Sequence, residues 1–391
     1  MKKLLLILVS FALILVLTSC EFIDNLIKDN EQDPPTEDTF EEGKTEEGAK
    51  EEEKEEAEEE NEEVEEENEE VEEEKTPTEG IKYELSKDGE YATAVGYEGT
   101  DTELHFLKEY EGVPVTKIGF EAFKGNTTIT SVTIHNGIKE IDAHAFRDCT
   151  ALTSLSFQKN STLEIIGYYS FSNCAIQTVK IPESVQKIDG LAFNGCLELN
   201  DITVPSHTVL GDQAFMYTGY ANNEANWEDG VLYLGTHFLK AKLEYRGDII
   251  IKEGTTTIAG FAFGYCRGID EIVIPDSVVA IGDLAFYEAS LDETLILPKN
   301  LKYIGNWAFY SFAVSYIYIP NNIEFIGGAA FNDIAIFGVY FGGTEADWNE
   351  MDNIDRGEFN RADIYYYSES SPTTEGYFWH YDENGNIVIW R

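Results

Sequence analysis

The chain has 391 residues, of which 74 are Asp or Glu and 27 are Lys or Arg, so its formal net charge at pH 7 is −47. Such an acidic chain is repelled by phosphates, which argues against nucleic acid as a partner and against direct docking on anionic lipid headgroups. Residues 81–391 alone carry −24.

The N-terminus has the pattern of an export signal. Lys2 and Lys3 precede the apolar run Leu4–Leu17, which is too short for a confident membrane span. The sequence "LTSC" that ends at Cys20 resembles the lipobox of bacterial lipoproteins. The resemblance implies a signal peptide at 1–19 and acylation of Cys20, whose lipid would hold the protein in the bilayer on the extracellular face of a bacterial membrane. The alternative is an ordinary secretory signal cleaved at a small residue.

Residues 20–80 follow as a different kind of chain. Between Glu37 and Glu74 there are 23 Glu, one Asp and three Lys, a net charge of −21. A segment with so few apolar side chains cannot offset the entropy of ordering, and its like charges repel. We therefore expect a disordered acidic tether between the lipidated Cys20 and the folded part.

The rest of the chain is a repeat built around phenylalanine. The intervals between successive Phe residues of the repeat are 23, 25, 22, 22, 48, 23, 23 and 22 residues. These residues are Phe123, Phe146, Phe171, Phe193, Phe215, Phe263, Phe286, Phe309 and Phe331. A period in the low twenties is typical of leucine-rich repeats, whose units bury their apolar faces only by stacking.

One unit, "IQTVKIPESVQKIDGLAFNGC" at Ile176–Cys196, illustrates the pattern. It predicts a short strand ended by Pro182, a tight bend at Asp189-Gly190, and Phe193 pointing inward. The pattern "I.IP..V..I...AF..C" is similar to that of BspA-like leucine-rich repeat proteins of bacterial surfaces. The fold implied by this resemblance is a β-rich leucine-rich-repeat solenoid, curved and right-handed, with β-hairpin caps.

The domain limits follow from where the repeat starts and stops. We expect an N-terminal hairpin cap at 81–112, the solenoid at 113–341 and an aromatic C-terminal cap at 342–391, whose Asn384-Gly385 is a hairpin turn signal. The doubled interval predicts a β-hairpin inserted at about 229–248, with strands at Val231–Leu234 and Phe238–Leu243. The competing interpretation is a degenerate repeat that uses Phe238.

The cysteines and the missing motifs argue against catalysis. Cys149, Cys174, Cys196 and Cys266 each lie three residues after a repeat Phe, which favours reduced thiols inside the coil over a bridge between adjacent turns. They do not have zinc-ligand spacing, and the sequence has no nucleotide-binding or hydrolase motif. We expect no enzyme activity, no cofactor and no metal site.

A partner surface is expected where the strand residues point outward. In the C-terminal half this column is apolar and aromatic: Val273, Ile296, Tyr318 and Tyr340, with Tyr316 alongside. The same residues would also stabilise a sheet without any ligand. The BspA resemblance implies adhesion to an extracellular protein, such as a host or matrix protein. The alternative is a structural envelope or glycan-binding lipoprotein that uses Trp379 and Trp390 of the C-terminal cap.

Overall fold

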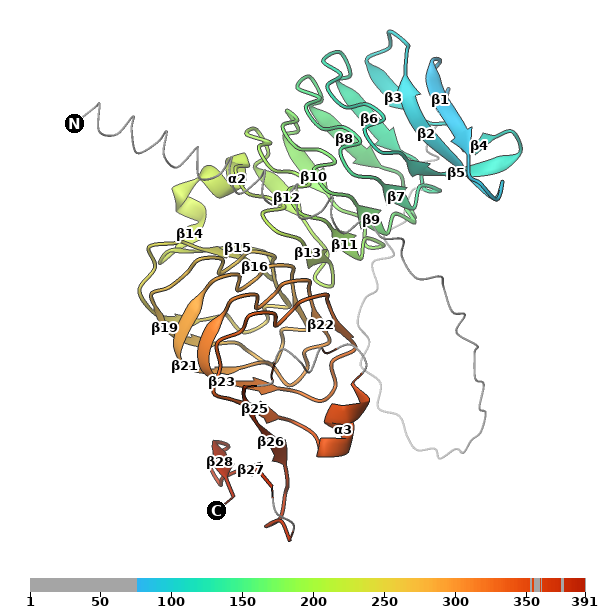
Figure 1. Cartoon of the computed structure of the whole chain (residues 1–391). Coiled ribbons are helices and arrows are strands. Elements are labelled where there is room, and N and C mark those ends of the chain that lie inside the picture. Colours follow the sequence, from blue (N-terminus) through green and yellow to red (C-terminus); the bar gives the residue numbers. More distant parts are fainter. Residues whose placement is uncertain (1–75, 352–353, 355–358, 360, 374–375, 391) are drawn as a thin grey trace, which may run out of the picture. The chain divides into compact units, whose positions relative to one another are not determined.

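The computed structural model describes residues 76–351, 354, 359, 361–373 and 376–390 (Figure 1). The predicted signal peptide, the lipidation site Cys20 and nearly all of the predicted tether lie outside these residues. Within the described part, no helix combines the length and the apolar character needed to cross a bilayer.

The described chain winds into a β-solenoid with two ladders of parallel strands, which confirms the predicted fold. Each turn contributes a two-residue strand to the short ladder and a longer strand to the other (Figure 1). The short ladder consists of β7 (Glu140–Ile141), β9 (Ile165–Ile166), β11 (Lys187–Ile188), β13 (Val209–Leu210), β18 (Thr257–Ile258), β20 (Ala280–Ile281), β22 (Tyr303–Ile304) and β24 (Phe325–Ile326).

The long ladder is divided into three sheets, ordered β3-β6-β8, β10-β12 and β17-β19-β21-β23-β25-β26-β27-β28. Its strands are β3 (Glu103–His105), β6 (Ser131–Ile134), β8 (Ser154–Phe157), β10 (Thr178–Lys180), β12 (Asp201–Thr203), β17 (Gly247–Ile250), β19 (Ile269–Val273), β21 (Ser290–Ile296), β23 (Ala313–Ile319), β25 (Gly338–Phe341) and β26 (Asp363–Tyr367). The last of these three sheets carries the apolar outward column of the sequence.

The repeated phenylalanines form a spine inside the coil. Phe146 is stacked on Phe171 with ring centroids 5.2 Å apart, and Phe286 on Phe309 at 5.0 Å. The other successive Phe rings stack in the same way, both from Phe123 to Phe215 and from Phe263 to Phe331. The predicted spine is therefore confirmed. In the described chain it runs as two stacks, since no ring contact joins Phe215 to the next stack.

The inserted segment explains this interruption. β14 (Trp227–Glu228), β15 (Val231–Leu234) and β16 (His237–Ala241) pair antiparallel, so the predicted hairpin is present. Its last strand also pairs in parallel with β18, and the ring of Phe238 stacks on Phe263 at 4.8 Å. Each of the two sequence interpretations is therefore correct in part: the hairpin begins a new stack, and Phe238 supplies its first ring.

The expected bend at the Gly or Asp after the Ile is present. A tight turn starts there, in which the Ala145 N–H donates to the Asp142 carbonyl at 3.3 Å and the Ala214 N–H to the Gly211 carbonyl at 3.4 Å. Gly211 has no positive φ; it is required because a Cβ there would lie 2.4 Å from the main-chain nitrogen of Gly190 in the preceding turn.

The reversal of the chain is completed by two positive-φ residues that flank the Phe. In the turn of Phe146 these are His144 (59°) and Asp148 (60°). Asp and Asn tolerate this left-handed region better than most residues.

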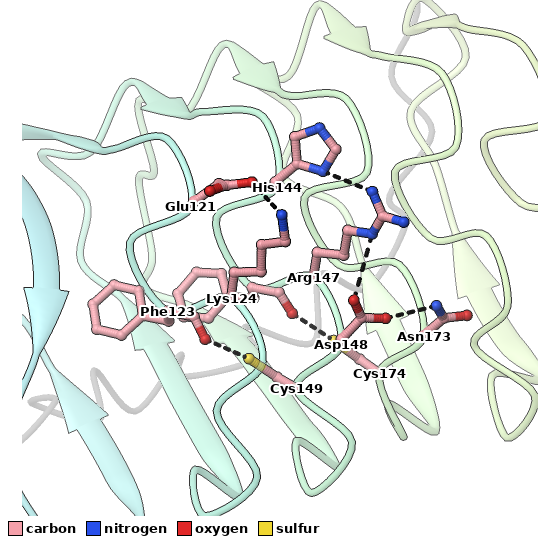
Figure 2. A network of polar contacts seen from close by, with 10 residues as sticks. Glu121, Phe123, Lys124, His144, Arg147, Asp148, Cys149, Asn173 and Cys174 are labelled. Atoms are coloured by element: carbon pink, nitrogen blue, oxygen red, sulfur yellow. Dashed lines mark hydrogen bonds and ion pairs between the residues drawn. The ribbon is translucent and has the colours of Figure 1, made fainter. Parts of the chain in front are cut away.

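The four cysteines of the described chain are free and buried. Each of the first three donates its thiol to the carbonyl of the Phe one turn back, as Cys149 does to Phe123 at 3.1 Å (Figure 2). Burial raises the pKa of the Cys149 thiol to about 12. The expectation of reduced thiols is confirmed. The geometry shows what these three thiols do: each adds a hydrogen bond to the preceding turn, at a Phe carbonyl that also accepts a main-chain N–H.

Both ends are closed by hairpins. β1 (Ile81–Leu85) and β2 (Ala92–Tyr97) pair antiparallel, while β4 (Glu109–Tyr110) pairs with β5 (Val113–Ile118). The parallel ladders begin earlier than residue 113, because β2 already pairs with β5 and β3 with β6. At the other end, β27 (Phe378–Tyr381) and β28 (Ile387–Ile389) form the terminal hairpin.

The described residues also include short helical segments that the repeat did not predict. Among them are α2 (Gly219–Asn222), the 3-10 helix η1 (Glu224–Asn226) and α3 (Glu345–Glu350). α3 starts with a capping box in which Thr344 and Asp347 bond each other's main chain, and its Trp348 packs on Phe341.

Candidate functional site

The predicted partner surface is the outward side of the sheet from β17 to β26, which we call the strand face. On β19 and β21 the outward Val273 and Ile296 are each 44% exposed, whereas their neighbours Ile272 and Leu295 are buried. The alternation of a β-strand produces this division. The structure thus places these two predicted site residues on an accessible surface.

The register of the sheet brings the outward residues into one column. Ile250 is aligned with Val273, Ile296 with Tyr318, and Tyr318 with Tyr340. Neighbours in such a column lie close enough for their side chains to touch. The column thus holds an apolar pair on β17 and β19, and an apolar-to-aromatic run on β21, β23 and β25.

The C-terminal end of this column is covered by the terminal hairpin. Trp379 of β27 meets Tyr318 edge-on, with ring centroids 5.6 Å apart, and lies 5.1 Å from the ring of Tyr367. Its indole Nε1 donates to the carbonyl of Phe341 at 2.8 Å. Tyr318, Tyr365 and Trp379 form a small core of their own on the strand face, which we call the hairpin core.

This cover corrects two expectations from the sequence. Tyr318 is only 6% exposed, and burial together with Tyr381 raises the pKa of its hydroxyl. Trp379 is fully buried, so it has no free ring face for a sugar. The reason is tertiary in both cases: the hairpin folds over the strand face instead of projecting from it. These two residues hold the cap in place.

The other predicted site residues remain partly accessible. Tyr316 and Tyr340 are half-buried and stacked on each other at 5.4 Å. Trp390 is also half-buried, stacks on His380 at 3.8 Å and donates its Nε1 to Ser368. The structure does not bring Trp390 into contact with the strand-face tyrosines through any described ring pair.

The corresponding column in the N-terminal half is polar. Ser156 of β8 donates its hydroxyl to Thr133 of β6 at 3.1 Å. Such hydroxyl pairs tie neighbouring strands together without offering apolar area to a partner. The apolar part of this outward column is thus confined to the C-terminal half.

Two strongly exposed residues of this region were missed in the sequence. Ile250 is 73% exposed and Phe337 is 71% exposed. A signal for Ile250 was present: "DIIIKEGTTTIAGFAF" has the spacing of "EIVIPDSVVAIGDLAF", which places Ile250 opposite Val273. The sequence pattern placed residues up to 248 in the hairpin, so the strand β17, which starts at Gly247, was not recognised.

Replacing Trp379 with alanine should release the terminal hairpin while leaving the solenoid folded. A fully buried indole of this size contributes about 3–5 kcal/mol, but here the loss falls on β27 and β28 alone. Limited chymotrypsin digestion should therefore cut the variant near its C-terminus much faster than the unmodified chain, with little change in the main thermal transition. Trp390→Ala, at a half-buried site, is the matched control. Equal digestion of Trp379→Ala and the unmodified chain would contradict the assignment.

Among the described residues there is no group of three or more His, Cys, Asp or Glu placed to hold a metal ion. The arrangement offers instead a scaffold of stacked strands with an apolar outer column. Solenoids of this kind bind partners along their stacked surfaces.

Parallel strands repeated about every 23 residues around an internal Phe spine define a leucine-rich-repeat solenoid. The family model described as "BspA type Leucine rich repeat region" matches residues 116–242 and 237–349 in six copies, and the chain belongs to this family. Family membership supports a role in protein interaction.

Solved structures similar to the chain are leucine-rich-repeat proteins of bacteria. A leucine-rich cell surface protein of Faecalibacterium prausnitzii A2-165 is 20% identical, over 72% of this chain and 98% of that one, with a TM-score of 0.32. A protein of Bacteroides ovatus ATCC 8483 is 21% identical, over 68% and 71%, also at 0.32. The pneumococcal vaccine antigen PcpA is 17% identical, over 75% and 93%, at 0.30. No curated protein matches the chain.

Proposed function

We propose that this protein is a lipid-anchored, non-catalytic surface protein of bacteria that binds an extracellular protein through its strand face. The single observation that carries the proposal is the exposure of Val273 and Ile296 on neighbouring strands of a repeat scaffold. Apolar side chains gathered on an otherwise acidic surface are a usual mark of a binding site.

The anchoring part of the proposal rests on the sequence. "LTSC" at the end of the apolar run supports acylation of Cys20, and the Glu-rich segment that follows would act as a spacer from the membrane. In this arrangement the solenoid is held outside the cell, facing other proteins.

The surroundings of Trp379 and Trp390 do not favour glycan recognition by these two residues. Trp379 is buried in the hairpin core, and Trp390 has one ring face against His380. A platform for sugar stacking needs an open aromatic face.

Replacing Val273 and Ile296 together with serine should lower the affinity for a protein partner about tenfold or more, because apolar contacts at the centre of an interface carry much of its energy. Binding to a panel of immobilised, purified extracellular matrix proteins, measured by surface plasmon resonance, tests this. The thermal transition should stay nearly unchanged, since both side chains are 44% exposed.

The matched control replaces Leu85 and Leu197, two exposed leucines away from the strand face, with serine. It should bind like the unmodified chain. Unchanged affinity of the Val273→Ser/Ile296→Ser variant would exclude the strand face as the site. Binding only to wall glycans, lost in Trp390→Ala, would favour the glycan alternative. Tyr318 is unsuitable for this test because its substitution would damage the hairpin core.

A further inference from the structure

The long ladder has an open edge where the strand face begins. β17 is the first strand of its sheet and pairs only with β19. The amides of Gly247 and Ile251 donate toward β19, at 3.1 Å to Gly268 and 3.0 Å to Val273. Because alternate residues of a strand direct their main-chain groups to opposite sides, those of Asp248 and Ile250 face away from the sheet.

The middle of this outward main chain is available for pairing. In the described chain two tyrosine hydroxyls bond its ends: Tyr245 donates to the Asp248 carbonyl at 2.7 Å, and Tyr233 accepts from the Lys252 N–H at 3.3 Å. Between them, no described hydrogen bond to another segment engages the N–H of Asp248 or either main-chain group of Ile250, and Ile250 is 73% exposed. Unpaired main chain at the edge of a sheet is a template for another strand.

The side chains beside the edge define what a further strand should carry. Ile250 and Val273 are aligned and both exposed, so an apolar residue next to Ile250 would extend this pair. The exposed Asp248 and Glu271 each lie two residues before an aligned residue, Ile250 and Val273, so both carboxylates are on the same face of the sheet near this edge. A basic residue beside Asp248 would meet two carboxylates.

The other unpaired charges around the β17 edge are also mainly negative. Glu244, Glu253 and Asp270 are also exposed and form no ion pair in the described part of the chain. The nearby Lys242 and Lys252 are already held by Glu224 and Glu228, both at 2.6 Å. The uncompensated charge at this edge is therefore mainly negative, with Arg246 as the exception.

The negative charge at this edge disfavours two occupants that the chain itself could provide, a second copy of the edge and the Glu-rich segment. A second copy would set one acidic edge against another, and residues 37–74 carry a net charge of −21. Like charges across an interface are unfavourable and slow association. An external segment of opposite charge remains.

We propose that the β17 edge binds an extended segment of a partner protein in which basic and apolar residues alternate, adding it to the sheet as a further strand. Main-chain bonds to Ile250 supply the affinity, while the apolar pair and Asp248 select the side chains. The inference rests on the proposed protein-binding function and names the partner's chemistry.

The probe is an octapeptide of alternating lysine and valine, titrated into the full-length protein at physiological ionic strength. Hydrogen exchange followed by mass spectrometry should show slowed exchange in the peptic fragment spanning 245–253. Peptides of alternating glutamate and valine, or of lysine and serine, should give no protection. The lysine-valine peptide methylated on alternate main-chain nitrogens should also fail, since it cannot pair with the edge.

Variants separate edge pairing from general attraction to an acidic protein. Ile250→Lys should weaken octapeptide binding about tenfold or more, by adding repulsion and removing the apolar neighbour. Leu243→Lys adds the same charge at an exposed leucine in the preceding loop and should bind nearly as the unmodified chain does. Ile250→Ser keeps the charge unchanged and should show an intermediate loss. All the variants keep the Glu-rich segment, so its attraction for the peptide is the same in each.

The outcomes distinguish this inference from the proposed function. Equal binding by Ile250→Lys and Leu243→Lys, or protection elsewhere than 245–253, overturns the edge assignment. Protection at 245–253 combined with undiminished partner capture by Val273→Ser/Ile296→Ser would uphold the edge and reject the strand face.

Discussion

Replacing Phe286 with alanine should lower the free energy of unfolding by about 3–5 kcal/mol. The ring is fully buried and stacked between Phe263 at 4.7 Å and Phe309 at 5.0 Å, with Phe312 tilted against it at 5.5 Å. Removing it leaves a cavity within a continuous stack, where the turns above and below cannot collapse without breaking their strand pairing. Urea denaturation followed by circular dichroism measures the loss.

The matched control is Phe325→Ala. Phe325 is exposed, and its one ring partner among the described residues is Tyr303 at 4.8 Å, so the same deletion should cost less than about 1 kcal/mol. Similar losses for the two variants would mean that the internal spine does not provide the main packing energy of the solenoid.

Replacing Asp212 with asparagine should stabilise the protein at pH 8 by up to about 4 kcal/mol and have little effect at pH 4. Asp212 is buried, and its Oδ2 has no hydrogen-bond partner in the described chain. Burial, with Asp283 adding to it, raises the pKa of its carboxyl to about 7. The other charged groups that face it are Asp189, Lys187 and Lys240.

The direction follows from proton binding. The folded protein keeps the Asp212 proton up to about pH 7, whereas the unfolded chain releases it near pH 4. Unfolding therefore releases a proton between these values, and stability falls as the pH rises through the window. His135 and His237 act in the opposite sense. Burial lowers the pKa of each to about 4, so their contribution is lost as the pH falls below about 6.5.

Because these effects overlap, the test is the difference between Asp212→Asn and the unmodified chain in urea denaturation from pH 4 to pH 8. That difference should grow with pH and level off above pH 7. Asp189→Asn is the control: it removes a carboxylate 3.0 Å from Lys187 and should lower stability at pH 8. A difference that does not vary with pH would show that Asp212 is ionised in the folded state throughout.

Much of the fold could be predicted because its cause is local and repeated. Phe146 and its equivalents recur at one spacing, and only a stack of turns lets each of them bury its ring. The thiols follow from the same periodicity, since Cys149 lies three residues after its Phe and meets the carbonyl of the turn before. The hairpin at 231–241 also has its own signals, the alternation of its strands and Gly235 at its turn.

The candidate site was predictable only in part. Val273 and Ile296 were found because strand alternation decides which side chains point outward. Tyr318 has the same alternation and is nevertheless buried, since a hairpin sixty residues further along the chain lies over it. Ile250 was not predicted for a related reason: its strand follows an insertion that interrupts the regular spacing of the repeats.

The sequence by itself thus determined the solenoid, its Phe spine and the polar and apolar halves of the outward column. It could do so because every repeat unit has buried residues at the same spacing. Only the tertiary structure decided which outward residues stay accessible. That choice depends on contacts between segments distant along the chain, such as Trp379 with Tyr318, and on β17 being left without a partner on one side. No periodic pattern encodes such contacts.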